Sequence, residues 1–537
     1  MQPKDQGKYL FRGTLILTMG ALFTKILSAF YRVPFQNIVG DVGFYIYQQV
    51  YPFYGIAVVL STYGFPVVIS KLYAEEVMKE EQSNIRQLFL VSLFFLFGFG
   101  ILCFLFLYTG ADWLARYMND SQLAGLLRLN AFIFLIMPII SLFRGFFQGS
   151  GYMLPTAVSQ VSEQFIRVVT ILVSAVYLVH FQYSLYTVGS GAVIGSITGG
   201  ITAALILFIF WLRIRKNQPL HPNADVFSQS GRIIKAFTLN ALPICISSML
   251  LILLQLADSL NLFSLLVDAG TASQQAKELK GVYDRGQPLI QLGTVVATSM
   301  SLSLVPLITK EKMQNNAGVL KEKIQLALKS SILVGVGATM GLWGIIRPTN
   351  MMLFENTAGS DVLAVLGALI LLGSIIMTVT AILQGLGFII FPAVTIIGGF
   401  LIKYLLNLLL VPQLGTMGAA IASVVTLTMI LVVFMVKLHT IMGEFIIDKY
   451  FYMVVLAAGI CMLIVLNVYL YLTNITYQLR ISDRMIASIQ ALSAVILGGF
   501  TYLVMILRSN VFKESELSLL PFGSKLIMFL PKRKRRE

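Results

Sequence analysis

The chain has 537 residues, of which 57% are hydrophobic and only 12% charged, and its mean hydropathy is +0.83. Soluble globular proteins are about 45–50% apolar and about 25% charged, so this composition excludes a chain built mainly of soluble domains. The formal net charge of +15 suits a nucleic-acid partner, but the cytoplasmic loops of membrane proteins carry a similar excess of Lys and Arg.

Apolar runs long enough to cross a bilayer recur along the whole chain. A membrane-spanning helix needs about 20 apolar residues, and the sequence predicts about fourteen such helices, which makes the fold class an all-α polytopic membrane protein. In chain order they are 13–38, 43–70, 87–109, 121–143, 155–179, 186–212, 236–266, 282–309, 324–346, 361–383, 388–411, 415–436, 450–472 and 485–507. The first run exceeds the length of a signal-peptide core, so we expect it to be retained.

The distribution of Lys and Arg predicts the orientation in the cell (plasma) membrane. With a cytoplasmic N-terminus, 26 of the 39 cations, Arg144 among them, fall in cytoplasmic segments, six are external and seven lie within spans. This bias predicts that both termini are cytoplasmic. The basic tail, ending PKRKRRE, is expected either to lie on the anionic inner leaflet or to be a disordered solvated segment.

An internal repeat relates the two halves of the chain. QGSGYMLPTAVSQVSEQFIR (148–167) aligns without gaps on QGLGFIIFPAVTIIGGFLIK (384–403) at a shift of 236, and the same shift places Tyr47 on Tyr283. It maps the first six spans onto the next six in the same direction, which is a parallel repeat. The predicted domains are an N-lobe (1–215), a linker (216–235), a C-lobe (236–440), the last two spans (441–510) and a basic tail (511–537).

Cations inside the predicted spans are the first candidate site. Lys25 and Arg32 share one face of the first span, and each costs about 2.5–3.5 kcal/mol at a bilayer centre. Arg285 begins the eighth span, with Asp284 either as its charge partner or as part of a solvated helix start. Although Arg32 is also able to snorkel to the outer headgroups, converging cations indicate a visiting anion such as pyrophosphate. The predicted substrate-binding residues are therefore Lys25, Arg32, Arg285 and Asp284.

Two acidic residues inside spans have other predicted roles. Asp258 is a partner for a cleft cation, an ion- or proton-coupling site, or a side chain that reaches the interface. Glu163 and Arg167 are four residues apart, a spacing that predicts a structural ion pair. In the second half Lys403 takes the place of Arg167, while Gly399 takes that of Glu163, so the cation is kept and the acid is not.

Three stretches resemble a known family: TKILSAFYRVPFQNIVG, SLFRGFFQGSGYMLPTAVSQVSEQ and VYDRGQPLIQLGTVVATSMSLSLVPLITK. The chain resembles the MOP superfamily of flippases and exporters, in its MurJ/SpoVB-like polysaccharide biosynthesis branch. The resemblance implies a two-lobed transporter in which spans 1, 2, 7 and 8 line a cationic cavity and spans 13 and 14 form a groove for a polyprenyl tail. The family moves undecaprenyl-pyrophosphate-linked saccharides such as lipid II to the outer leaflet, in peptidoglycan, other envelope polysaccharide or sporulation pathways.

The expected function is therefore a flippase that works by alternating access. A MATE-like cation or drug antiporter, which favours acids in the cleft, and a non-transporting scaffold for envelope synthesis are the alternatives. An enzyme that modifies lipids would need clustered acids, His or a metal motif, and the sequence has none. We expect a monomer without cofactor or metal. The expected partners are a lipid-linked saccharide pyrophosphate, membrane lipids and a coupling Na⁺ or H⁺, but no nucleic acid.

Overall fold

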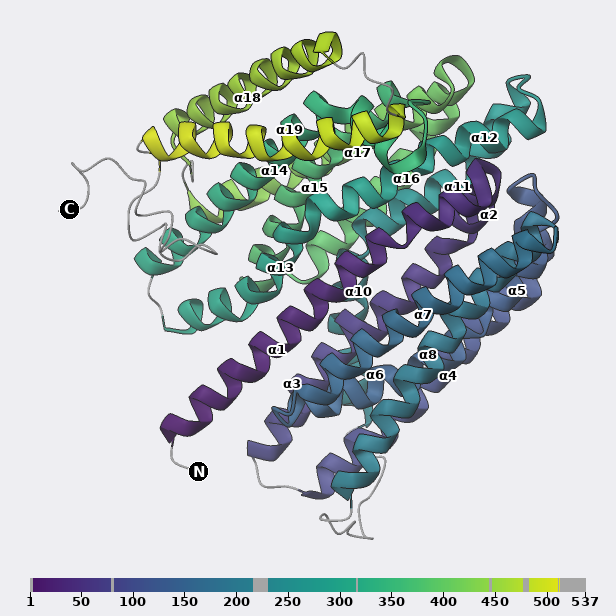
Figure 1. Ribbon diagram of the computed structural model, residues 1–537. Coiled ribbons are helices and arrows are strands. Elements are labelled where there is room, and N and C mark those ends of the chain that lie inside the picture. The colour runs from purple at the N-terminus through teal and green to yellow at the C-terminus, as the bar shows by residue number, and fades with distance from the viewer. Residues whose placement is uncertain are drawn as a thin grey trace. The chain divides into compact units, whose positions relative to one another are not determined.

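The computed structural model describes residues 3–78, 82–215, 230–314, 317–443, 447–476 and 482–509, and residue 511. The described part is helical and contains no strand (Figure 1). Most of the predicted linker 216–235 and nearly all of the predicted tail 511–537 lie outside the described residues. The all-α fold predicted from hydropathy is confirmed.

The first half of the chain forms α1 to α8, with one π-helical segment, η1. The helices are α1 (Pro3–Phe30), α2 (Arg32–Val59), η1 (Leu60–Gly64), α3 (Phe65–Met78), α4 (Gln82–Tyr117), α5 (Leu123–Ala131), α6 (Ile133–Gly149), α7 (Leu154–His180) and α8 (Leu185–Arg215). α2 is broken at Gly40, whose φ of 69° is a conformation that glycine adopts without strain. The first predicted span therefore runs through α1 into the start of α2.

The second half forms α9 to α19, with a second π-helical segment, η2. The helices are α9 (Ser230–Ala236), η2 (Phe237–Ala241), α10 (Leu242–Ser248), α11 (Leu250–Asp268), α12 (Ser273–Asp284), α13 (Gly286–Met313), α14 (Ala317–Phe354), α15 (Ser360–Gly385), α16 (Ile390–Leu414), α17 (Thr416–Met442), α18 (Lys449–Thr476) and α19 (Asp483–Arg508).

Twelve stretches of the described residues are long and apolar enough to cross a membrane. One of them, Met19–Met78, has 60 residues and holds the first two predicted spans. The predicted eighth span falls on α13, of which the side chains at 296–306 are outside the described part. The twelve stretches, one of which holds two spans, are together with α13 compatible with the prediction of about fourteen spans.

The helix boundaries follow the repeat. α6 ends at Gly149 and α15 at Gly385, and α7 begins at Leu154 and α16 at Ile390, so both pairs are 236 residues apart. The turn between each pair of helices uses a glycine at the same offset with positive φ, 77° at Gly151 and 91° at Gly387. The repeat predicted from sequence thus extends to the backbone.

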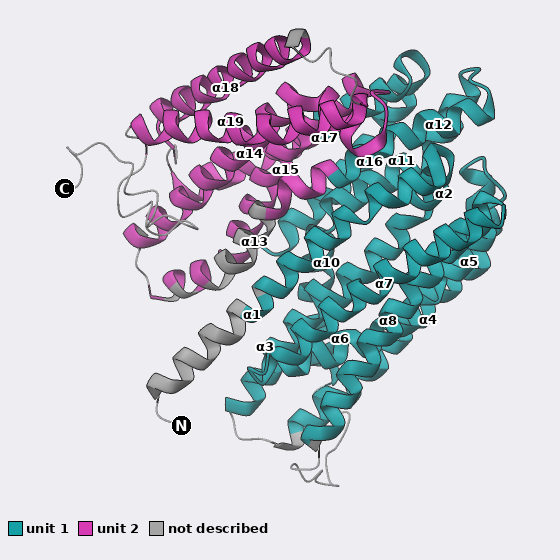
Figure 2. Ribbon diagram, in the orientation of Figure 1, with its two compact units in different colours: residues 1–288, 388–426 teal, residues 289–387, 427–537 magenta. Residues whose placement is uncertain are grey.

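By packing, the chain divides into two compact units (Figure 2). Unit 1 comprises Met1–Pro288 and Phe388–Thr426, and unit 2 comprises Leu289–Gly387 and Leu427–Glu537. Unit 1 thus joins the first eight helices to α9, at the end of the predicted linker, and to α10–α12, α16 and the start of α17 from the repeat's second half. The predicted lobes follow the duplication of the sequence and stay a prediction. All the predicted site residues belong to unit 1.

Candidate functional site

Arg167 on α7 is at the centre of a buried cluster of tyrosines in unit 1. Its Nη2 donates to the hydroxyls of Tyr31 and Tyr47, at 2.8 and 2.7 Å, and these two hydroxyls are 2.6 Å from each other. Its Cζ lies 4.2 Å from the ring centroid of Tyr54. Its Nε donates to the Ser196 hydroxyl and its Nη1 to the Gln164 Oε1. In the described part of the chain, no carboxylate pairs with Arg167.

Close packing of α8 on α7 holds Arg167 in this position. A Cβ at Gly199 would come within 3.0 Å of the Arg167 Cβ and 2.7 Å of the Glu163 carbonyl oxygen. Small residues allow membrane helices to approach in this way. The approach brings Ser196, one turn earlier on α8, within 3.2 Å of the Arg167 Nε.

Arg32 begins α2 immediately after Tyr31 and is buried, with 2% of its surface exposed. Its Cζ lies 4.3 Å from the centroid of the Tyr51 ring, while the Arg167 Cζ lies 5.7 Å from the same centroid. The Arg32 Nε has no hydrogen-bond partner among the described residues. The two guanidinium groups therefore share one aromatic ring, which stabilises cations through cation–π attraction.

Lys25 lies two turns before Arg32 on α1 and is half-buried. Its ammonium has no ion pair within the part of the chain that the structure describes. α1 packs against α7, where a Cβ at Gly20 would lie 3.3 Å from the Cβ of Ala157. The predicted binding roles of Lys25 and Arg32 stay predictions, and the structure adds Arg167 to them as a third cation. We call Lys25, Arg32 and Arg167 the first-half cations.

The predicted ion pair between Glu163 and Arg167 is wrong. Glu163 instead accepts from the Nη2 of Arg144 on α6, at 2.7 Å, and Thr62 and Ser159 accept from the other N–H groups of this arginine. Arg144 was predicted to be in a cytoplasmic segment, yet only 1% of its surface is exposed. A spacing of four residues permits an ion pair but does not require one, because Arg144 competes for the same carboxylate from another helix.

Arg285 does not pair with Asp284; it binds Asp41 on α2. Its Nη2 lies 2.7 Å from each carboxylate oxygen of Asp41, and its Nε is 3.0 Å from Oδ1. Gly281, one turn earlier on α12, makes this approach possible, because a Cβ there would overlap the Asp41 carbonyl oxygen. A two-oxygen contact of this kind is among the strongest that arginine makes. The sequence signal that was missed is Asp41 itself, next to the helix-breaking Gly40.

Asp284 pairs with Lys280 in the same helix, and both side chains are completely buried. The Lys280 Nζ is 2.7 and 2.8 Å from the two carboxylate oxygens. Both predicted roles of Asp284, as partner of Arg285 and as part of a solvated helix start, are therefore wrong. The i,i+4 spacing from Lys280 was the missed signal.

Asp258 on α11 forms an ion pair with Lys403 on α16, at 2.7 Å from Oδ1 to Nζ. Tyr283 donates to its Oδ2 at 2.8 Å and Asn407 to its Oδ1 at 2.9 Å. Of the three alternatives for Asp258, the structure has the partner of a cation. Lys403, in the position that the repeat assigns to Arg167, is thereby neutralised.

Charge compensation therefore differs along unit 1. The buried cations Lys280, Arg285 and Lys403 each have a carboxylate within 2.7 Å, whereas none of the first-half cations has one among the described residues. Buried amides add unused hydrogen-bonding groups on α2, α7 and α11; those without a partner in the described part include atoms of Gln48, Gln49, Gln160, Gln164 and Gln255. Unpaired buried polar groups indicate contact with water or a polar ligand.

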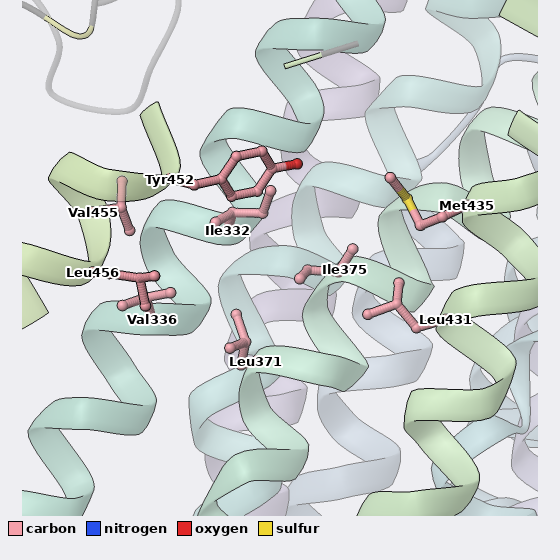
Figure 3. A pocket seen from close by; sticks show the side chains of 9 residues that line it. All are labelled: Ile332, Val336, Leu371, Ile375, Leu431, Met435, Tyr452, Val455 and Leu456. Carbon is pink, nitrogen blue, oxygen red and sulfur yellow. The ribbon is translucent and has the colours of Figure 1, made fainter. Parts of the chain in front are cut away.

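Unit 2 contains an apolar cavity of about 280 Å³ (Figure 3). It lies between α14, α15, α17 and α18, and its lining includes Ile332, Leu371, Met435 and Val455. Tyr452 is the one lining side chain with a polar atom. No group of His, Cys, Asp or Glu within the described ranges is arranged to hold a metal ion.

Residues 10–312 match the family described as polysaccharide biosynthesis protein. The chain is 42% identical over 528 residues, and over 98% of each chain, to the Bacillus subtilis protein described as uncharacterized membrane protein YabM. It is 27% identical over 438 residues to the lipid II flippase MurJ of the same organism, covering 77% of this chain and 79% of MurJ. Stage V sporulation protein B, also from Bacillus subtilis, is 27% identical over 435 residues, covering 78% and 81%.

Two groups of solved structures share the fold. The lipid II flippase MurJ in an inward closed conformation superposes with a TM-score of 0.65 at 15% identity, over 92% of this chain and 98% of that one. An inward-facing MATE multidrug transporter of the MOP superfamily gives a TM-score of 0.62 at 16% identity, over 80% and 98%. These similarities confirm the resemblance that the three sequence motifs indicated.

Proposed function

Because the chain belongs to the family of polysaccharide biosynthesis proteins, we propose that it moves a lipid-linked saccharide with a pyrophosphate headgroup across the membrane. The chain is a multi-pass membrane transporter and not an enzyme. The proposed substrate is an undecaprenyl-pyrophosphate-linked saccharide, lipid II or another envelope precursor, carried from the inner to the outer leaflet. The name of its relative MurJ specifies lipid II.

The observation that carries this proposal is that, among the described residues, no carboxylate forms an ion pair with any of the first-half cations. A buried cation without a counter-ion is strongly destabilised in a medium of low dielectric constant. Tyrosine rings and hydroxyls offset part of this cost at Arg32 and Arg167. A pyrophosphate would supply the missing negative charge, and the two guanidinium groups give it directional, charge-assisted hydrogen bonds.

The surrounding side chains suit the saccharide portion of such a substrate. The buried amides of Gln48, Gln160 and Gln255 have donor or acceptor atoms without a described partner, and sugar hydroxyls both donate and accept. The Tyr51 and Tyr54 rings flank the two guanidinium groups. Relative to the sequence prediction, the site keeps Lys25 and Arg32, gains Arg167, and leaves Arg285 and Asp284 to their own ion pairs.

The hydrocarbon tail has a candidate binding surface in unit 2. The cavity between α14, α15, α17 and α18 is lined almost entirely by aliphatic side chains. In water, binding would stabilise a polyprenyl chain by about 25 cal/mol for each Å² of apolar surface that it buries. Inside a bilayer the chain is already out of water, so binding is favoured only by closer van der Waals packing against the cavity wall. We therefore assign this cavity to tail recognition and the first-half cations to the headgroup.

A leaflet-exchange measurement tests the proposal. The protein is reconstituted in vesicles with a fluorescent undecaprenyl-pyrophosphoryl disaccharide, and a membrane-impermeant reductant quenches the label in the outer leaflet. Arg32→Ala and Arg167→Ala should each slow exchange at least about tenfold, the loss of one charge-assisted contact. Arg128→Ala is the matched control, since Arg128 is exposed and pairs with Asp112. Wild-type exchange by a folded Lys25→Ala/Arg32→Ala/Arg167→Ala variant would refute the anion site.

A MATE-like antiporter is the second candidate, because a MATE transporter shares the fold. An exchanger of cationic drugs uses unpaired carboxylates in its cleft, whereas Asp41, Asp258 and Asp284 are all paired with Lys or Arg. Vesicles that exchange ethidium but not the lipid-linked disaccharide would favour the antiporter.

The orientation with both termini cytoplasmic also stays a proposal, supported by the bias of Lys and Arg. Single cysteines placed at the exposed residues Tyr183 and Met78 test it. In intact cells an impermeant maleimide should label Cys at 183 and spare Cys at 78. The reverse pattern would invert the proposed topology.

A further inference from the structure

The ammonium of Lys403 is enclosed by oxygen atoms. Its Nζ lies 2.7 Å from the Asp258 Oδ1, 2.9 Å from the Asn407 Oδ1 and 2.6 Å from the carbonyl oxygen of Ala419. The side chains of Lys403, Asp258 and Asn407 are at most 3% exposed. A carboxylate, an amide and a main-chain carbonyl are also the oxygen ligands by which proteins hold hard metal cations.

Neighbouring groups fix these oxygens independently of Lys403. Tyr283 donates to the Asp258 Oδ2, and the Asn407 Nδ2 donates to the Asp258 Oδ1 and to the Asn261 Oδ1. The Asn407 amide is thereby oriented with its Oδ1 toward the ammonium. The oxygen cage is therefore formed by α11, α16 and α17, and Tyr283 of α12 holds the Asp258 carboxylate in it.

The repeat shows that a carboxylate is not a general requirement of a cation at this position. Arg167, the first-half equivalent of Lys403, binds the Tyr47 hydroxyl directly. In the second half Asp258 lies between Lys403 and Tyr283, the equivalent of Tyr47. The second half thus contains an additional acid together with the oxygens that surround the cation.

We propose that the Lys403 ammonium is a tethered cation that fills a binding site for a free monovalent metal ion, formed by Asp258, Asn407 and Ala419. The charge and the contacts of the ammonium replace those of Na⁺, so this chain needs no dissolved cation at Asp258. The inference is independent of the transported substrate. It replaces the expectation that Asp258 binds a coupling ion.

A polar cavity lies close to this site and shares Asn261 with its surroundings. A cavity of about 290 Å³ opens between α11, α16 and the segment that follows α4, and its lining includes Asn261, Ser264, Asp268 and Tyr404. The Asn261 Oδ1 accepts from Asn407, which contacts both Asp258 and Lys403. In a cation's path from this polar cavity, the side chain of Asn261 would be followed by Asn407, which is part of the cage.

The test is cation binding by the purified full-length protein in detergent. Binding of ²²Na⁺ and the Tm are measured in NaCl and in choline chloride at equal ionic strength. The wild type should show no ²²Na⁺ binding that is lost when Asp258 is replaced. Its Tm should be equal in both salts. Lys403→Met should bind about one Na⁺ per chain, and Na⁺ should raise its Tm by at least about 2 °C, because a ligand of the folded state stabilises it.

The double variant Asp258→Asn/Lys403→Met is the control, since it has no charge at the site, and it should bind no Na⁺. Stoichiometric ²²Na⁺ binding by the wild type that Asp258→Asn abolishes would overturn the proposal. A folded Lys403→Met protein that binds neither Na⁺, Li⁺ nor K⁺ would also overturn it. So would a Lys403→Met protein that aggregates in all three salts while the double variant stays folded. Folding of Lys403→Met only in the presence of one of these ions would support it.

Discussion

Arg285 binds both carboxylate oxygens of Asp41, a residue 244 positions earlier in the chain. The guanidinium is completely buried, whereas the Asp41 side chain is 21% exposed. Arg285 follows the last residue of α12, so the contact joins the end of this helix to α2 and connects the repeat's second half with the first inside unit 1. Because the two partners differ in burial, substitution of one should destabilise the protein more than substitution of the other.

Asp41→Asn should therefore be more harmful than Arg285→Gln. Loss of the carboxylate removes the charge-assisted hydrogen bonds of Asp41 from a completely buried guanidinium and should cost about 3–5 kcal/mol. Loss of the arginine leaves a carboxylate that water can reach. Thermal unfolding in detergent should rank the Tm values as wild type, Arg285→Gln and then Asp41→Asn. If Arg285→Gln were the less stable protein, the guanidinium would have a role beyond this pair.

Gly281→Ala should separate α12 from α2. A methyl group at this position would overlap the Asp41 carbonyl oxygen, and overpacking of this kind costs about 1–3 kcal/mol or more. The control is Gly98→Ala on α4, where no atom lies within 4 Å of the added Cβ. We expect a lower Tm for the first variant alone, and equal Tm values would contradict the close approach.

Glu163→Gln should lower stability without slowing transport per folded molecule. It leaves Arg144 buried without its carboxylate, at a cost of about 3 kcal/mol, but does not touch the first-half cations. Tm and lipid exchange, normalised to folded protein, measure the two effects. The double variant Arg144→Met/Glu163→Met should recover much of the lost Tm, because no buried charge remains. A loss of lipid exchange without a loss of Tm would instead indicate that Glu163 belongs to the substrate site.

Arg167→Lys should reduce exchange about tenfold although the charge is kept. One guanidinium now reaches Tyr31, Tyr47 and Ser196 at once, and a lysine ammonium cannot reproduce this planar fork. The measurement is the dependence of the exchange rate on substrate concentration in vesicles. An unchanged rate would mean that charge alone, and not its orientation, matters at this position.

Ile375→Trp should impair long-chain substrates selectively. The larger side chain would fill part of the apolar cavity in unit 2, so exchange of the undecaprenyl substrate should fall while that of a short-chain analogue should not. Val468→Trp on the exposed face of α18 is the control. Equal effects on both chain lengths would exclude this cavity as the tail site.

Part of the candidate site was accessible from the sequence. Lys25 and Arg32 stand out because a charge in an apolar run is costly. A cationic partner was one of the three roles that the sequence left open for Asp258, which pairs with Lys403. Lys403 and Arg167 were matched through the repeat. These inferences need only local composition and the comparison of two segments.

The partners of the charged groups were not accessible in the same way. Glu163 has a cation four residues away on its own helix, yet it pairs with Arg144. Arg285 is adjacent to Asp284 in the chain, yet it pairs with Asp41. Long side chains reach carboxylates on several helices. The pair that forms depends on helix approach, which glycines such as Gly281 and Gly199 control from outside the charged motif.

The sequence alone was sufficient to predict a helical membrane protein with an internal repeat, from its hydropathy, its duplicated segment and the charged residues inside its apolar runs. This is possible because each segment that enters a bilayer must satisfy its own backbone hydrogen bonds. Three-dimensional packing alone selected the cations that have no ion pair with a carboxylate among the described residues. An ion pair needs two side chains at about 3 Å, and that distance arises only when helices remote in the chain are brought together.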